Sequence, residues 1–157
     1  MVTQPVVVEG TLTVNVPQDR AWSFLKHPAS LSACIPGVSN ITARQDGTFR
    51  ATVEVAISVL KAQFDMQVRI AEEQPLSCLV AEMSGSDAKT GTLLKTRNRV
   101  DLTPKNSGQT RIAFRIDAVL SGKLAALGGG MAVKLHSRRM ARAFAATLKQ
   151  NMEAREG

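Results

Sequence analysis

The chain has 157 residues, of which 44% are hydrophobic and 21% are charged. This length and composition suit one domain with a sizeable core and exclude an intrinsically disordered chain. No segment approaches the run of about 20 apolar residues that a membrane span needs, and residues 1–5 lack the features of a secretion signal, so we expect a cytoplasmic protein. The net charge of +7 favours acidic proteins, anionic lipids or nucleic acids as partners without choosing among them.

The first third of the chain predicts a strand followed by two short helices. Alternating apolar residues indicate a half-buried strand over residues 6–16. Pro17 ends this strand, and Asp19 lies near the start of a short helix, where a carboxylate suits the unpaired backbone amides. A second short helix follows Pro28, and the Pro36–Gly37 pair then turns the chain away.

The middle of the chain predicts a meander of six more strands. Each segment alternates apolar and polar residues, as half-buried strands do. Asp46–Gly47 and Asn106–Gly108 are turn sequences, Pro75 separates two strands, and a tight connection is expected near Val59–Leu60. The predicted strands are 39–45, 49–57, 62–70, 79–83, 96–102 and 112–120.

From Met131 to Met152 the hydrophobic period changes to that of a helix, which predicts a long amphipathic helix. Its apolar stripe consists of Val133, Met140, Ala141, Phe144 and Leu148. Met131 and Leu135 interrupt the opposite, polar side. The glycines 128–130 just before the helix would allow it to hinge or to lie close to a ligand, and a simple loop is the alternative.

These elements predict an α+β fold in which a curved seven-stranded antiparallel sheet wraps around the long C-terminal helix. Two short helices complete the predicted fold. We expect residues 1–157 to form a single domain, with residues 1–5 and 153–157 as loosely ordered ends.

Several blocks of sequence carry a resemblance to a known family. They are Val16-Pro17, Ala21-Trp22, Phe24-Leu25, Leu31, Cys34-Ile35-Pro36-Gly37-Val38, Ser121-Gly122-Lys123-Leu124 and Leu127-Gly128. With these blocks the chain resembles, nearly end to end, the helix-grip (SRPBCC) superfamily of START domains and polyketide cyclases, and within it the CoxG family of carbon monoxide dehydrogenase. The resemblance implies an apolar cavity between the sheet and the long helix. It also implies a role in bringing a molybdenum hydroxylase, such as carbon monoxide dehydrogenase, to the membrane or its quinone pool, with no chemistry by the CoxG-like chain itself.

The resemblance also bears on the membrane. Many members of this family continue into a variable tail that contacts the membrane, whereas this sequence ends at Gly157 with polar residues. We therefore expect peripheral association with the inner face of the membrane rather than direct anchoring.

We predict that the cavity holds a hydrophobic molecule, lipid-like or quinone-like. Thr96 and Asn98 fall on the apolar face of their strand, where an unpaired hydroxyl or amide costs about 1–3 kcal/mol. A ligand would satisfy them, and bonding to backbone or buried water is the alternative. Methionines suit an adaptable pocket, although ordinary packing also explains them. The predicted ligand-binding residues are Phe24, Leu31, Met66, Met83, Thr96, Asn98, Phe114, Met131 and Phe144.

We predict no catalytic residue, metal site or cofactor. His27 and His136 are the only histidines, and no serine or cysteine stands in a recognisable elbow or triad context. Cys34 and Cys78 are far apart and are expected to be buried thiols. The glycines 128–130 lack the pattern of a phosphate-binding loop. A cyclase-like or hydrolase-like enzyme acting on a hydrophobic substrate remains the alternative.

Two basic surfaces are predicted. Five cations share the outward face of two neighbouring strands: Lys95, Arg97, Arg99, Arg111 and Arg115. Because the chain has only five Phe, one Trp and no Tyr, mostly at core positions, we expect no specific nucleic-acid binding. On the C-terminal helix, Arg138, Arg139 and Arg142 are predicted to bind a partner protein. A pure protein adaptor with a filled core and no small ligand is the third hypothesis.

Overall fold

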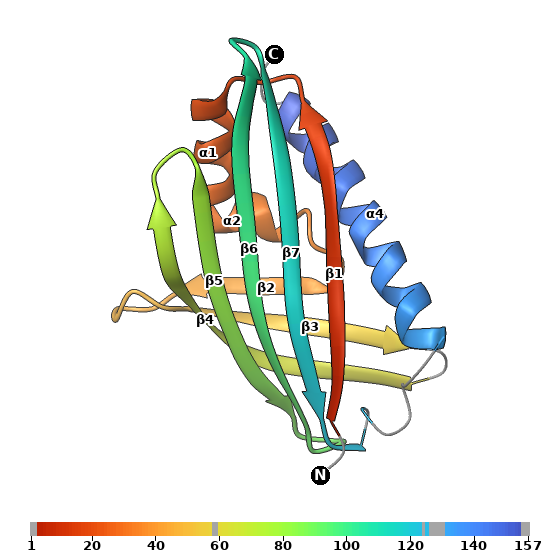
Figure 1. Ribbon diagram of the computed structural model, residues 1–157. Helices are drawn as coiled ribbons and strands as arrows, with labels where there is room; N and C mark the ends of the chain where they lie inside the picture. Colours follow the sequence, from red (N-terminus) through yellow and green to blue (C-terminus); the bar gives the residue numbers. More distant parts are fainter. Residues whose placement is uncertain (1–2, 58–59, 124, 126–130, 155–157) are drawn as a thin grey trace.

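The computed structural model describes residues 3–57, 60–123, 125 and 131–154. Seven antiparallel strands form one sheet in the order β1-β7-β6-β5-β4-β3-β2, and the helices lie on one face of it (Figure 1). The strands are β1 (Thr3–Val14), β2 (Val38–Ala43), β3 (Phe49–Ile57), β4 (Leu60–Gln74), β5 (Cys78–Asp87), β6 (Thr92–Asn106) and β7 (Gln109–Ser121). The helices are α1 (Gln18–Lys26), α2 (Pro28–Ser32) and α4 (Met131–Ala154). The predicted α+β architecture is confirmed.

The sheet is strongly curved, so that β2 and β3 run crosswise to β6 and β7 (Figure 1). The pairing register shifts in β2, in β4 between Ile70 and Glu72, and in β6 between Pro104 and Asn106. A bulge of this kind bends a strand and increases its twist. The curvature creates a concave face, on which α1, α2 and α4 pack.

Side chains alternate between the two faces of the sheet, as the sequence pattern predicts. On the concave face the buried residues form two clusters. The first joins the sheet to α1 and α4 and includes Trp22, Leu25, Ile112, Phe114, Phe144 and Leu148. The second lies toward β3 and β4 and includes Ala62, Phe64, Met66, Leu94 and Leu120. The outward positions carry mostly exposed polar and charged residues.

The C-terminal half of α4 is tied to the sheet by an aromatic contact and a polar clamp. The rings of Phe114 and Phe144 meet edge to face, with centroids 4.8 Å apart and planes at 77°. The Lys149 ammonium donates to the Thr13 carbonyl oxygen at 3.0 Å and to the Glu153 carboxylate at 2.6 Å. Glu153 also accepts the Asn15 backbone amide at 2.9 Å. These hydrogen bonds, first from Lys149 and then from Asn15, lower the pKa of Glu153.

His27 joins the two short helices. Its backbone amide donates to the Phe24 carbonyl oxygen at the end of α1, and its Nδ1 accepts the Ser30 backbone amide at 3.3 Å at the start of α2. The histidine therefore caps both helices.

Some predicted segments lie at the ends of the described residues or outside them. β1 begins at Thr3 and α4 ends at Ala154, and the loosely ordered ends stay a prediction. The connection near Val59 and the glycines 128–130 lie outside the described residues.

Gly10 provides a test of the packing between the sheet and α4. It lies opposite Phe114, and an added Cβ would stand 2.7 Å from the ring Cζ. We expect Gly10→Ala to lower the free energy of unfolding by about 1–3 kcal/mol, because the ring must move away from Phe144. Gly108→Ala is the control, since its Cβ would meet only the Asn106 side chain at 3.9 Å. Equal losses for both variants in urea denaturation would contradict this account.

Candidate ligand-binding site

The middle of the concave face is less buried than its two ends. Two rows of inward side chains cross the sheet there, and eight of these residues remain partly accessible. We call these eight the central band: Val6, Ile70, Ala81, Met83, Thr96, Asn98, Ile116 and Ala118. Ile70 retains 38% of its surface, whereas Phe114 on one side of the band retains 4% and Met66 on the other 1%. Solvent therefore reaches the concave face at the band, between the two buried clusters.

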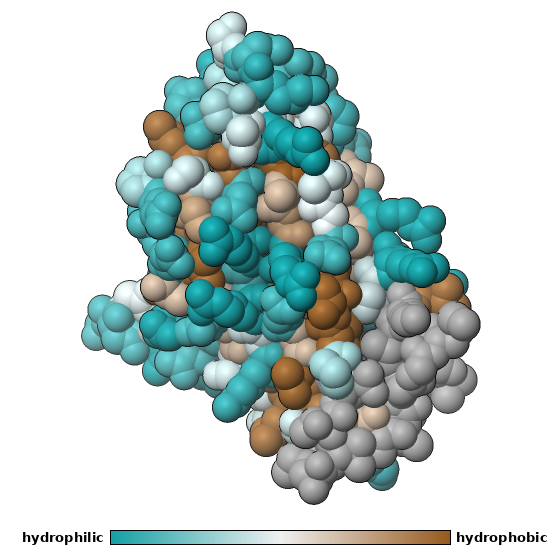
Figure 2. Space-filling model, in the orientation of Figure 1, coloured by the Kyte–Doolittle hydropathy of each residue, from teal (hydrophilic) through white to brown (hydrophobic). Residues whose placement is uncertain are grey.

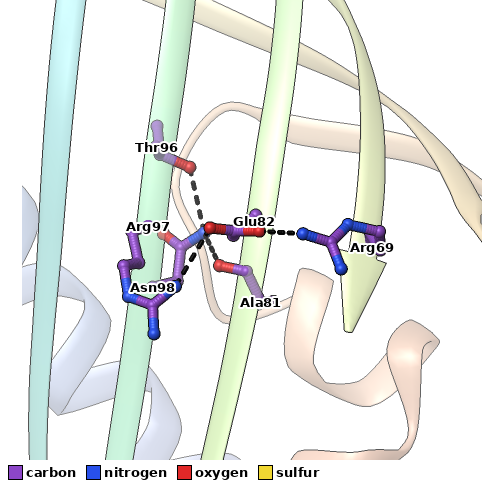
Figure 3. Close-up of polar contacts among 6 residues, drawn as sticks. All are labelled: Arg69, Ala81, Glu82, Thr96, Arg97 and Asn98. Carbon is purple, nitrogen blue, oxygen red and sulfur yellow. Dashed lines mark hydrogen bonds and ion pairs between the residues drawn. The ribbon is translucent and has the colours of Figure 1, made fainter. Parts of the chain in front are cut away.

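Thr96 and Asn98 place a polar pair inside this largely apolar band. The Asn98 amide nitrogen donates to the Ala81 carbonyl oxygen at 3.1 Å and to the Thr96 hydroxyl oxygen at 2.9 Å (Figure 3). Both hydrogens of the amide are thereby used. Within the described residues, the Asn98 carbonyl oxygen and the Thr96 hydroxyl hydrogen have no hydrogen-bond partner. The pair therefore keeps one acceptor and one donor available to the band.

The structure distributes the predicted ligand-binding residues over three places. Phe24, Phe114 and Phe144 belong to the cluster around α1 and α4, and Leu31 packs against it. Met66 lies in the second cluster with Met83 beside it. Thr96, Asn98 and Met83 meet in the central band, whereas for Met131 only the backbone is described. Their role in ligand binding stays a prediction.

Five apolar members of the band were not among the predicted site residues: Val6, Ile70, Ala81, Ile116 and Ala118. Strand alternation already placed all five on the inner face of the sheet. Alternation carries no information on how deeply each position is covered, so it could not single them out.

The outer face of the sheet carries an open depression of about 520 Å³ over β4 to β7. Its outward-facing lining residues are Gln67, Arg69, Glu82, Ser84, Lys95, Arg97, Asp117 and Val119, and Met83 and Thr96 of the inner face also border it. Glu82 accepts hydrogen bonds from Arg69 and Arg97 there (Figure 3). Hydrophilic side chains cover the middle of this face (Figure 2). Exposed ion pairs of this kind are typical of a solvated surface, so we place the candidate site at the central band.

Comparison with known proteins identifies the family. The family model for CoxG, a subunit of carbon monoxide dehydrogenase, matches residues 10–153. The chain belongs to this family. No curated protein matches the sequence.

Solved structures similar to this CoxG-family chain share its fold. A conserved protein from Geobacillus kaustophilus is 19% identical, with coverage of 95% of this chain and 96% of that chain and a TM-score of 0.80. A START superfamily protein from Mycobacterium smegmatis is 18% identical, with coverage of 94% and 97% and a TM-score of 0.66. The Zhui aromatase/cyclase from Streptomyces sp. R1128 is 14% identical, with coverage of 97% and 93% and a TM-score of 0.59. These likenesses confirm the predicted helix-grip fold.

The titratable groups of the CoxG-family chain mainly support its structure. Among the described residues, Asp87 is the only buried charged side chain, and sequence reasoning left it unplaced. It accepts hydrogen bonds from the Thr90 hydroxyl at 2.7 Å and the Lys89 amide at 3.2 Å, and the bond from Thr90 is the main cause that lowers its pKa. Asp87 therefore stabilises the turn between β5 and β6 as a carboxylate.

The cysteines are buried free thiols, as predicted. Burial is the main cause that raises the pKa of the Cys78 thiol, which disfavours the reactive thiolate. In the described part of the chain, no three His, Cys, Asp or Glu side chains gather as a metal site would require. No helix in that part is long and apolar enough to cross a membrane.

The predicted basic patch on the outer face is largely neutralised by cross-strand and same-strand ion pairs. Arg97 pairs with Glu82, and Arg99 with Asp101. Arg115 pairs with Glu9 and Asp117. Hydrogen bonds to Asp101 and Asp117 are the main causes that raise the pKa values of Arg99 and Arg115.

Three arginines on α4 are unpaired. Arg138, Arg139 and Arg142 are exposed and have no carboxylate partner among the described residues. Leu135 on the same helix is also 44% exposed. The surface of α4 thus presents three unpaired arginines together with an exposed apolar side chain.

Titration of the His136 ring should make the stability of the protein depend on pH. Its ring is partly buried, and this burial, aided by the charge of Arg139, lowers its pKa below 6.5. The unfolded chain therefore binds a proton more readily than the folded chain, so stability is full above about pH 6.5 and falls as the pH drops below it. We expect His136→Gln to reduce the loss of melting temperature between about pH 7.5 and 5.5. An unchanged pH profile would show that His136 is solvated in the folded protein.

Proposed function

We propose that this CoxG-family protein is a noncatalytic carrier of a hydrophobic molecule, lipid-like or quinone-like, held at the central band between the sheet and α4. The incomplete burial of the band carries this proposal. Binding sites for small apolar molecules are concave and mostly apolar, with a few polar groups that set orientation. The likeness to START and aromatase/cyclase structures supports the proposal, because the helix-grip resemblance implies an apolar cavity at the same place, between the sheet and the long helix.

The chemistry of the band favours binding over catalysis. Its eight members are apolar except for Thr96 and Asn98, neither of which titrates near neutral pH. A cyclase-like enzyme needs an acid or base within hydrogen-bond reach of its substrate. Asp87, the buried carboxylate of the described chain, is instead occupied by the turn that it stabilises.

We also propose that the protein is an accessory subunit of a molybdenum hydroxylase of the carbon monoxide dehydrogenase type. The exposed guanidinium groups of Arg138, Arg139 and Arg142 would meet an acidic surface of that enzyme, with Leu135 as an apolar contact. Such an assembly fits a cytoplasmic protein with peripheral association at the inner face of the membrane. A pure adaptor would use the same arginines and hold no small molecule.

Filling the central band should abolish binding of the ligand. Ala118 lies opposite Thr96, so Ala118→Phe would place a ring in the band. We expect the affinity for the neutral dye Nile red, measured by fluorescence titration, to fall at least about tenfold. Ala113→Phe is the matched control, because Ala113 lies on the other face of the same strand. Equal binding by both variants would place the dye elsewhere.

The carrier hypothesis also predicts that the native protein contains a bound ligand. Native mass spectrometry of protein from its own host should show a stoichiometric apolar molecule. If the protein is reproducibly empty and also fails to bind Nile red, the carrier function is wrong and the adaptor hypothesis is favoured.

Charge reversal on α4 should release the partner enzyme. We expect Arg138→Glu, Arg139→Glu and Arg142→Glu together to reduce recovery of molybdenum hydroxylase subunits from host extract by at least about tenfold. The control carries Lys95→Glu and Arg111→Glu on the outer face of the sheet, where recovery should stay unchanged. Equal recovery with both variants would remove α4 from the interface.

A further inference from the structure

We infer that Thr96 and Asn98 recognise the polar end of the bound molecule, and that this end is a neutral hydroxyl group. The inference rests on the proposed carrier function and adds the chemical class of the ligand. It follows from which hydrogen-bonding groups of the pair are already used and which are left.

The orientation of the Asn98 amide is set by two hydrogen bonds. Its nitrogen donates to the Ala81 carbonyl oxygen at 3.1 Å and to the Thr96 hydroxyl oxygen at 2.9 Å. Reversing the amide would set its oxygen against the Ala81 carbonyl oxygen, and two acceptors repel. The Asn98 oxygen is therefore left as an acceptor, and the Thr96 hydroxyl, which already accepts, is left as a donor.

These two groups lie side by side and belong to the same strand. One hydroxyl group can donate to the Asn98 oxygen and accept from the Thr96 hydroxyl at the same time. A carbonyl or ether oxygen can only accept, so it would leave the Asn98 oxygen without a donor, at a cost of about 1–3 kcal/mol once water is displaced. The pair therefore discriminates in favour of a ligand that carries a hydroxyl, which among quinone-like molecules is the reduced quinol form rather than the quinone.

The described strand residues around the pair disfavour a charged ligand group. The remaining members of the central band are apolar, so none of them can neutralise a carboxylate or a phosphate. The charged residues next to the pair along β5 and β6 are Glu82, Lys95, Arg97 and Arg99, and strand alternation turns all four to the outer face. There Glu82 pairs with Arg97, and Arg99 pairs with Asp101. An anionic group at the pair would also face the Asn98 oxygen, which is an acceptor.

The test compares three probes of equal chain length: 1-decanol, decyl methyl ether and decanoate. Each displaces Nile red from the wild-type protein, and the dissociation constants are compared. We expect decanol to bind about tenfold more tightly than the ether, as one additional satisfied hydrogen bond implies. Decanoate should bind more weakly than decanol.

Two variants remove the recognition groups while keeping the shape of the side chains. Asn98→Leu should bring the affinities for decanol and the ether to within about twofold of each other without weakening the binding of the ether. Thr96→Val leaves the Asn98 acceptor in place, so it should keep the preference for decanol and weaken the binding of both probes by a similar factor of about threefold or more, because both accept from the Thr96 hydroxyl. Thr103→Val is the control, because Thr103 lies exposed on the outer face of the same strand. It should keep the preference for decanol.

The outcomes separate the two proposals. If none of the probes displaces the dye and the dye itself does not bind, the carrier function fails and the inference fails with it. If decanol and the ether bind equally well to the wild-type protein, the carrier function stands and hydroxyl recognition is overturned. If Asn98→Leu does not fold, the Thr96→Val variant decides, and undiminished binding of both decanol and the ether by that variant overturns the inference.

Discussion

The edge-to-face contact of Phe114 and Phe144 is the interaction on which the rest of the structure depends, because it fixes where α4 meets the sheet. Such a pair contributes about 0.5–1.5 kcal/mol beyond the area that it buries. It is possible only because Gly10 on the neighbouring strand has no side chain to collide with the Phe114 ring. The hydrogen bonds of Lys149 and Glu153 to the end of β1 strengthen the same attachment. Since these contacts all involve the C-terminal half of α4, the helix can cover the concave face without burying the central band.

The sheet separates the charged and the neutral functions of the protein. Strand alternation sends the arginines and carboxylates of β4 to β7 to the outer face, where they pair across and along the strands. The same alternation leaves apolar side chains and one hydrogen-bonded polar pair on the inner face. The neutrality of the proposed site is therefore a consequence of strand alternation, and the ion pairs stabilise the charges on the solvated side. Those pairs neutralise Arg97, Arg99 and Arg115, whereas Arg138, Arg139 and Arg142 on α4 stay unpaired and form a cluster of positive charge.

The sequence was sufficient to predict the helices and strands and the face of the sheet on which each strand residue lies. The Asp46–Gly47 turn, the change of period at Met131 and the apolar stripe through Phe144 and Leu148 are all local signals, and the structure has the elements that they predict. The extent to which each inward side chain is buried was not predictable, because it depends on which part of the concave face α1 and α4 cover. Met66 and Asn98 both point inward, yet Met66 is buried in a cluster and Asn98 is not. The ion pairs could not be predicted from the sequence either, since the pairing of Arg97 with Glu82 depends on the register of β5 and β6.

In the proposed site, affinity and orientation arise from different interactions. Each methylene group of a ligand that leaves water contributes about 0.8 kcal/mol, so a chain of ordinary length supplies most of the binding energy. One satisfied hydrogen bond contributes only about 1 kcal/mol in net terms, but a mismatched group leaves a buried acceptor unpaired. Thr96 and Asn98 would therefore contribute little to how tightly a molecule is held and much to which end lies at the centre of the band. A carrier that must deliver a molecule in a defined orientation benefits from this division, because its affinity can stay moderate while the orientation of the molecule is fixed.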